Sequence, residues 1–128
     1  MGGHAAYSQR IGGFVEQKWM TVDVIDGYKA IYNEETPNSI PSEMSVKPNA
    51  TYLIKNKKGY IREIAIYGKD CRLKKTIHVN HRHGDIPMGT AHVHNHRGGR
   101  EANVRRMNKK EIKNYRHIVF GIMGGKIW

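Results

Sequence analysis

Short runs of β-branched and aromatic residues, separated by turn residues, recur along most of the chain. Asp26-Gly27 separates the first two runs, and this pair is typical of a two-residue hairpin turn because glycine readily adopts positive φ. A proline-containing stretch at residues 33–50 is expected to be a surface loop. The pattern predicts an antiparallel β-meander. Its strands are expected over Trp19–Ile25, Tyr28–Tyr32, Thr51–Lys55, Tyr60–Tyr67 and Leu73–Val79, with a further short strand over Thr90–His94.

A helical period occurs near the C-terminus. Asn108 followed by Glu111 has the form of a capping box, in which a small polar residue precedes a glutamate by three positions. Ile112, Tyr115 and Val119 then recur at helical spacing. Together with the meander, this pattern predicts an α+β fold in which the sheet dominates and one C-terminal amphipathic helix follows it.

The length of 128 residues predicts one domain with a modest core, since only 38% of the residues are apolar. Glycines and small side chains predict a flexible N-terminal arm over residues 1–14, followed by a single basic, histidine-rich domain over residues 15–128. Cys71 is the only cysteine, which excludes an intrachain disulfide. The chain shows neither a signal-peptide pattern nor an apolar stretch of about eighteen residues, so we expect a cytoplasmic protein without a membrane partner.

The positive charge is concentrated in one part of the chain. Residues 1–50 contain four Lys/Arg and six Asp/Glu, whereas residues 51–128 contain eighteen Lys/Arg and five Asp/Glu. The net charge of +11 therefore comes entirely from the second part. A field of this kind attracts phosphate backbones, which favours nucleic acid as a partner over a basic surface that only aids solubility.

Histidines cluster where this basic part begins. Six of the eight lie within residues 78–96, namely His78, His81, His83, His92, His94 and His96. A spacing of two residues places side chains on one side of an extended strand. Two such segments, joined across the turn at residues 84–89, are expected to bring His81, His83, His92 and His94 together, with Asp85 in the turn.

Converging imidazoles allow three interpretations. The four histidines, with Asp85 as an oxygen ligand, could hold a divalent transition metal such as zinc or nickel. Alternatively, His81, His83, His92 and His94 could supply the acid and base that cleave RNA through its own 2′-hydroxyl. In the third interpretation they are polar surface residues without a chemical role.

Basic side chains follow the histidines directly and are expected to form a phosphate-binding rim beside them. This predicted nucleic-acid-binding set is Arg97, Arg100, Arg105, Arg106, Lys109, Lys110 and Lys113. A solvated helix face would account for part of the set without a function.

Several of these features occur together in a known group of proteins. The start Met1-Gly2-Gly3, the strands over residues 51–67, the turn Gly68-Lys69-Asp70, and His81-Arg82-His83 ahead of His92-Val93-His94 resemble small phage and prophage proteins, often encoded beside a minor head protein. They are similar to the polymorphic toxin type 24 domain, whose members carry D-H-x-H followed by P-H-x-H. This chain has His78 and Asn80 where aspartates are expected, and Ala91 where proline is expected.

The resemblance implies a nuclease toxin, with an inhibitor protein or phage head proteins as further partners. The sequence therefore predicts a phage-encoded, toxin-like nuclease, with RNA preferred over DNA, in the cytoplasm or the phage particle. The alternative is a non-enzymatic phage accessory protein that binds DNA or the capsid, with a histidine-bound structural metal. The positive charge fits the nuclease and the accessory protein equally, because both would bind a polyanion.

Overall fold

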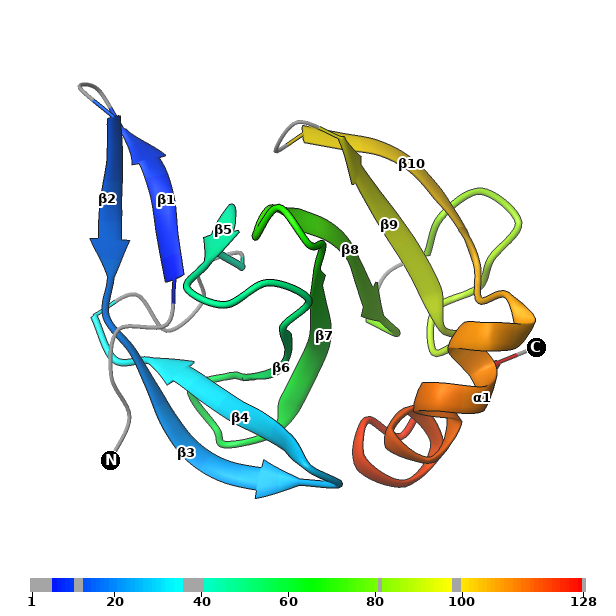
Figure 1. The fold of residues 1–128 in the computed structure, drawn as a ribbon. Helices are drawn as coiled ribbons and strands as arrows, with labels where there is room; N and C mark the ends of the chain where they lie inside the picture. Colours follow the sequence, from blue (N-terminus) through cyan, green and yellow to red (C-terminus); the bar gives the residue numbers. More distant parts are fainter. Residues whose placement is uncertain (1–5, 11–12, 36–40, 81, 98–99, 128) are drawn as a thin grey trace.

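The computed structural model describes residues 6–10, 13–35, 41–80, 82–97 and 100–127. Within them, a seven-stranded sheet has the order β10-β9-β8-β7-β6-β4-β3 (Figure 1). Its strands are β3 (Trp19–Ile25), β4 (Tyr28–Asn33), β6 (Thr51–Lys55), β7 (Ile61–Tyr67), β8 (Leu73–His78), β9 (His92–Arg97) and β10 (Arg100–Arg106). Helix α1 (Lys109–His117) follows, and a π-helical turn, η1 (Ile118–Ile122), continues it.

The sheet is mixed, which corrects the prediction of a purely antiparallel meander. The pairs β3–β4 and β6–β7–β8–β9–β10 are antiparallel, as expected from their short connections. However, β4 pairs with β6 in parallel, with Lys29 opposite Tyr52 and Ile31 opposite Ile54. A parallel pair needs a connection long enough to return the chain to the starting edge. The proline-containing stretch between β4 and β6 provides it.

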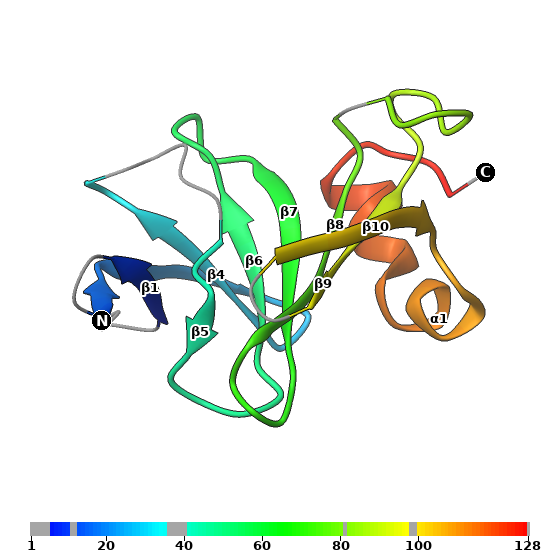
Figure 2. The ribbon, with the colours of Figure 1, turned by 90° about the horizontal axis from the view of Figure 1, so that it is seen from above.

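A second, small sheet contains β1 (Ala6–Arg10), β2 (Gly13–Gln17) and β5 (Met44–Ser45), in the order β2-β1-β5. Figure 2 shows β1 and β5 on one side of the molecule and α1 with the C-terminal segment on the other. The segment expected to be a flexible arm thus contains a strand. This strand, β1, forms because its backbone pairs with β2 and β5. Amino-acid composition alone does not predict such pairing.

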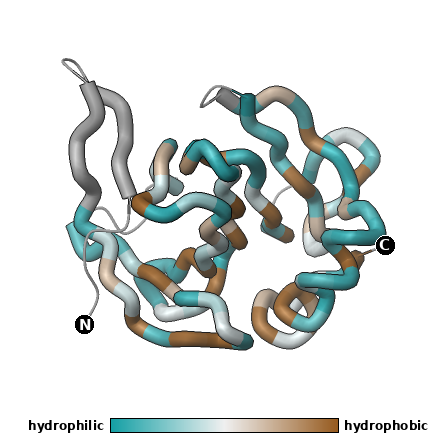
Figure 3. The backbone as a smooth tube through the Cα atoms, viewed as in Figure 1, coloured by the Kyte–Doolittle hydropathy of each residue, from teal (hydrophilic) through white to brown (hydrophobic). Residues whose placement is uncertain are grey.

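The two faces of the large sheet carry two hydrophobic clusters. On one face, Ile64, Ile77 and Val93 pack with Tyr115 of α1 and Val119 of η1. The turn after α1 is strongly hydrophobic, as expected of a segment that covers a sheet (Figure 3). A second cluster contains Trp19, Ile31, Tyr52, Ile54, Ala65, Tyr67 and Leu73. The side chains of Glu63 and His78 alternate with those of Ile64 and Ile77, so they lie on the face away from α1.

Helix α1 begins at the predicted capping box. The Asn108 side chain accepts a hydrogen bond from the Glu111 backbone at 2.9 Å, and the Glu111 carboxylate accepts one from the Asn108 backbone at 2.8 Å. Glu111 also accepts bonds from Arg105 at 2.7 and 2.8 Å and from Lys75 at 2.7 Å. This carboxylate therefore joins α1 to both β8 and β10. In the described part of the chain, no helix is long and apolar enough to cross a bilayer.

Candidate metal centre

His78, His92 and His94 lie together on the sheet face opposite α1. In the β8–β9 ladder, His78 is opposite His92 and Thr76 is opposite His94. Residues that face each other in an antiparallel ladder point to the same side of the sheet. His94 lies two residues after His92 and therefore points to that side as well.

The three imidazoles are in mutual contact. One ligand atom from each of His78, His92 and His94 lies within 4.8 Å of the other two. The rings of His78 and His94 are stacked with centroids 4.1 Å apart, and the other two ring pairs are 4.9 and 5.0 Å apart. Burial is deep, since His92 is 0% exposed and His94 is 7% exposed.

His83 approaches the same group from the loop between β8 and β9. Its backbone exchanges hydrogen bonds with Ile86 at 2.8 and 3.0 Å, closing a turn in which Gly84 has a φ of +56°. This turn places the centroid of the His83 ring 4.8 Å from the ring centroid of His92 and 4.7 Å from that of His94. The expected convergence of the two histidine segments is therefore observed for these three residues.

Hydrogen bonds orient two of the buried rings. His92 Nδ1 lies 3.1 Å from the Thr90 carbonyl oxygen, which can only accept, so this nitrogen carries the proton. His94 Nδ1 contacts the Glu101 carboxylate of β10. His94 Nε2 is buried without a hydrogen-bond partner among the described residues. Metal-binding histidines commonly donate the second ring nitrogen to a carbonyl or carboxylate in this way.

Charged groups surround the cluster. The Glu63 carboxylate lies 3.9 Å from His78 Nε2 and 3.1 Å from Arg62. Burial raises the pKa of Glu63 to about 6, although the Arg62 charge opposes this rise. The hydrogen bond from His94 lowers the pKa of Glu101. Burial lowers the pKa of His96, an effect that the Glu101 charge partly offsets.

The cluster borders a cavity of about 290 Å³. Residues from β7, β8, β9 and β10, together with the segment before β5, surround it: Pro41, Glu43, Glu63, Leu73, Thr76, His78, His94, His96 and Glu101. His78 and His94 thus face both the other imidazoles and a space that a small group could enter.

The residues brought together differ from the predicted metal and catalytic set. His83, His92 and His94 converge, whereas His81 lies outside the described residues. Asp85 is exposed and does not belong to the group of ligand atoms around His92. His78 takes part instead, because the β8–β9 register places it opposite His92.

The predicted basic rim is divided between the two faces of the sheet. Arg106 is opposite His92 in the β9–β10 ladder and donates to the Asp85 carbonyl at 3.4 Å. Arg105 points the other way, to Glu111. Lys109, Lys110 and Lys113 are exposed on α1, which covers the face without histidines. Arg97 is exposed at the end of β9, and Arg100 begins β10, with its side chain outside the described part.

Comparison with family models, curated proteins and solved structures gives no match for this chain. The resemblance to the polymorphic toxin type 24 domain therefore stays an expectation from the sequence.

Proposed function

We propose that the protein is a toxin-like nuclease, with RNA as its preferred substrate, that uses a divalent transition metal held by His78, His92 and His94. One observation carries the proposal: three imidazoles converge on one sheet face beside a cavity, and acceptors already hold the second nitrogen of two of them. Three protein ligands with one open position are typical of catalytic zinc sites. Phage origin, location in the phage particle, and an inhibitor or head-protein partner are proposed from the sequence resemblance alone, and location in the cytoplasm is proposed from the sequence analysis.

Burial favours metal binding over metal-free acid/base catalysis. A general acid or base must come within hydrogen-bond distance of the proton that it transfers. His92 is 0% exposed, so a phosphate of a nucleic-acid chain does not reach its ring. A metal ligand has no such requirement, because it only needs a neutral nitrogen directed at the ion. The role first expected for His92, in an acid/base pair, is therefore replaced by ligation in this proposal.

The spacing of the nitrogens fits a small ion after modest ring rotation. Nitrogens bound to one tetrahedral zinc lie roughly 3.4 Å apart, given bonds of about 2.0–2.1 Å. The ligand atoms here lie within 4.8 Å of one another. A metal bound at this position would acidify water and polarise a phosphoryl oxygen, which is the chemistry that phosphodiester hydrolysis needs.

Two further residues have positions that suit the reaction. Glu63 lies beside His78 on the cavity wall, where its carboxylate can accept a proton from water. Arg106 is exposed in the row of residues that contains His78 and His92, where its charge can stabilise a phosphate.

The test is an incubation of the purified chain with end-labelled RNA and with DNA of the same sequence. Each substrate is incubated with the untreated protein, with protein treated with a chelator, and with chelator-treated protein to which excess zinc or nickel has been added. We expect RNA cleavage that the chelator abolishes, that added metal restores, and that His94→Gln lowers to the level of the chelated protein. His117→Gln is the matched control, because His117 is exposed on α1 and outside the cluster.

Two outcomes contradict the proposal. Cleavage that persists in the chelator would indicate metal-free chemistry. Failure of the metal-loaded chain to cut RNA or DNA would exclude the nuclease function.

His83 favours a second candidate function. Its ring lies 4.7–4.8 Å from those of His92 and His94, so it could act as a fourth ligand. Four protein ligands close the coordination sphere and are typical of a structural metal. The protein would then be a non-enzymatic phage accessory protein that binds DNA or the capsid. In that case metal removal lowers the melting temperature while no substrate is cut.

A further inference from the structure

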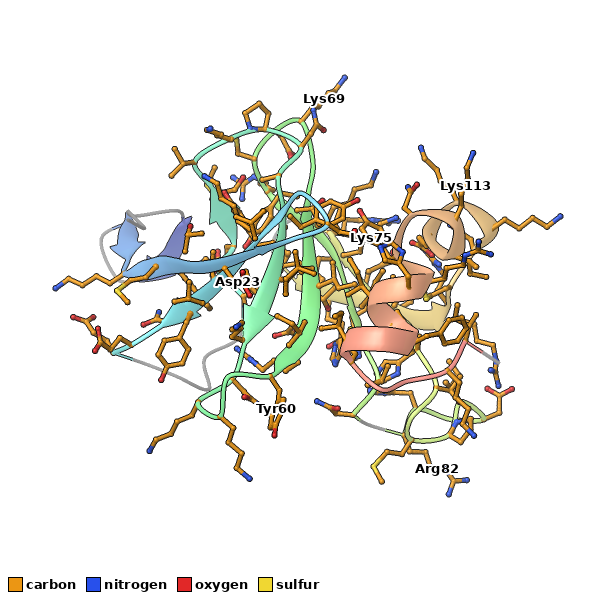
Figure 4. All side chains as sticks on the ribbon, turned by 90° about the horizontal axis from the view of Figure 1, so that it is seen from below. Asp23, Tyr60, Lys69, Lys75, Arg82 and Lys113 are labelled. Carbon is orange, nitrogen blue, oxygen red and sulfur yellow. The ribbon has the colours of Figure 1, made fainter. Side chains whose placement is uncertain are left out.

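A second cavity, of about 450 Å³, lies between the sheet and α1, on the face away from the histidine cluster. Its basic lining residues come from the β7–β8 turn, from β8 and from α1: Lys69, Lys74, Lys75 and Lys110. Figure 4 shows Lys69 and Lys113 projecting on the same side of the molecule, with Lys75 between them and Tyr60 on the opposite side. We refer to this cavity as the lysine groove.

A β-bulge accounts for two of the lysines. In the β7–β8 ladder, Leu73 pairs with Tyr67 and Lys75 pairs with Ile66, so Lys74 is an extra residue on β8. Neighbouring residues of a regular strand point to opposite faces, but a bulge redirects one side chain. As a result, Lys74 and Lys75 both line the groove.

The groove has an excess of positive charge, which Glu111, the one carboxylate among its described lining residues, does not balance. Glu111 already binds Lys75 and Arg105. Lys69, Lys74 and Lys110 are exposed and make no ion pair with any described residue. The lining also includes the neutral amides of Asn49 and Asn114 and the hydroxyl-bearing side chains of Thr51 and Tyr115, together with Ile66, Tyr67 and Gly68.

We propose that the lysine groove binds the phosphate backbone of nucleic acid independently of base sequence. Three ammonium groups that make no ion pair with a described residue lie around one cavity, an arrangement that matches a run of phosphates. The groove offers no stacking surface for bases, because Tyr67 and Tyr115 are buried at 3% and 7% exposure. Among the described residues that line it, no large apolar side chain is exposed, in contrast to the surfaces by which peripheral proteins enter a membrane.

This inference takes nucleic acid as the ligand from the proposed function, but it does not depend on cleavage. RNA held in the groove lies across the sheet from the histidine cluster. The groove would therefore anchor a segment of the polymer away from the bond that is cut. The predicted rim beside the histidines contained Lys110 but neither Lys69 nor Lys74.

The test compares two double variants that remove the same charge. Lys74→Ala/Lys110→Ala removes two groove lysines, and Lys57→Ala/Lys58→Ala removes two exposed lysines from the β6–β7 turn. Affinity for single-stranded RNA is measured by fluorescence anisotropy over a range of salt concentrations, with a chelator present to prevent cleavage. Thermal unfolding verifies that both variants fold.

We expect the groove variant to bind RNA about tenfold more weakly at low salt and to reduce the slope of log affinity against log salt by roughly 1.4, or about 0.7 for each lost phosphate contact. The control variant should change neither value appreciably. Equal weakening in both variants would show that only net charge matters and would overturn the proposal, as would an unchanged groove variant.

Two more arms separate the remaining explanations. If vesicles containing phosphatidylserine bind through Lys74 and Lys110 while RNA binding is unaffected, the ligand is a membrane and the proposal is wrong. His94→Gln should retain full RNA affinity. A wild-type chain that binds RNA through the groove but does not cut it would contradict the proposed function alone. Metal-dependent cleavage together with unchanged affinity in the groove variant would contradict the groove alone.

Discussion

His78 and His92 face each other across the β8–β9 ladder, with ring centroids 4.9 Å apart. One ends a strand and the other begins the next, and residues 79–91 separate them along the chain. The cluster therefore depends on strand pairing as well as on a local histidine motif. It follows that ligands from both strands should contribute to metal affinity.

We expect the chain to bind one zinc or nickel ion, with lower affinity in His78→Gln and in His94→Gln. Affinity should fall as the pH drops below about 6, because protonated imidazole does not bind metal. At a free metal concentration of 100 times Kd, the folded state should gain about 2.7 kcal/mol. Calorimetric titration measures the metal affinity at each pH, and elemental analysis measures how much metal is bound. His117→Gln should behave as wild type, and a chain without bound metal at neutral pH would contradict the prediction.

Glu101 is expected to act as a positioning residue for His94. Glu101→Gln keeps the shape of the side chain but removes the negative charge that orients the His94 imidazole. Loss of such a partner commonly lowers metal affinity by about 10- to 100-fold. Competition with a metal-binding dye measures the change, with Glu34→Gln as an exposed control. Unchanged affinity would show that the contact between Glu101 and His94 does not support ligation.

Local sequence signals predicted much of the fold. The Asp26-Gly27 turn and the capping box at Asn108 are both present, because each depends on residues close together in the chain. The parallel pairing of β4 with β6 depends on how a long connection returns, which alternation does not encode. Strand β10 was not predicted, since its charged sequence lacks an apolar alternation and its pairing with β9 defines it.

The candidate site, like the fold, was predictable only where it depends on residues that are close together in the sequence. A spacing of two residues places His92 and His94 on one face without knowledge of the fold. His78 joins the cluster only because of the β8–β9 register, which places it opposite His92. Glu101 reaches His94 only because the β9–β10 ladder is irregular, with a shift in register between Glu101 and Asn103. The distribution of the basic residues over two faces likewise follows from the alternation of side chains along β10 and from the position of α1 on one face of the sheet. Charge counts do not contain this information.

Gly125 is expected to tolerate no side chain. A Cβ at this position would lie 3.0 Å from Val79 Cβ and 3.2 Å from the Gly89 carbonyl oxygen. Gly125→Ala should therefore destabilise the fold by about 1–3 kcal/mol through overpacking. Gly121→Ala, where a Cβ meets open space, should be neutral or stabilise by about 0.5 kcal/mol. Chemical denaturation compares the two, and equal effects would refute the steric argument.

Glu111 should make the stability of the fold depend on acid. Burial raises the pKa of its carboxyl, but hydrogen bonds from Arg105, Lys75 and the Asn108 backbone outweigh burial and hold the pKa at about 2. A pKa below the value in the unfolded chain means that the contribution is complete above about pH 5 and is lost as the pH falls toward 2. A shift of this size corresponds to roughly 3 kcal/mol.

Glu111→Gln should therefore destabilise the protein by about 3 kcal/mol at neutral pH, since Arg105 and Lys75 lose their charged partner. The difference in unfolding free energy between wild type and variant should shrink as the pH falls from 5 to 2. Urea denaturation at each pH measures this difference, in which contributions from the other titrating groups cancel. A difference that stays constant down to pH 2 would show that the network contributes through shape and not through the charge of Glu111.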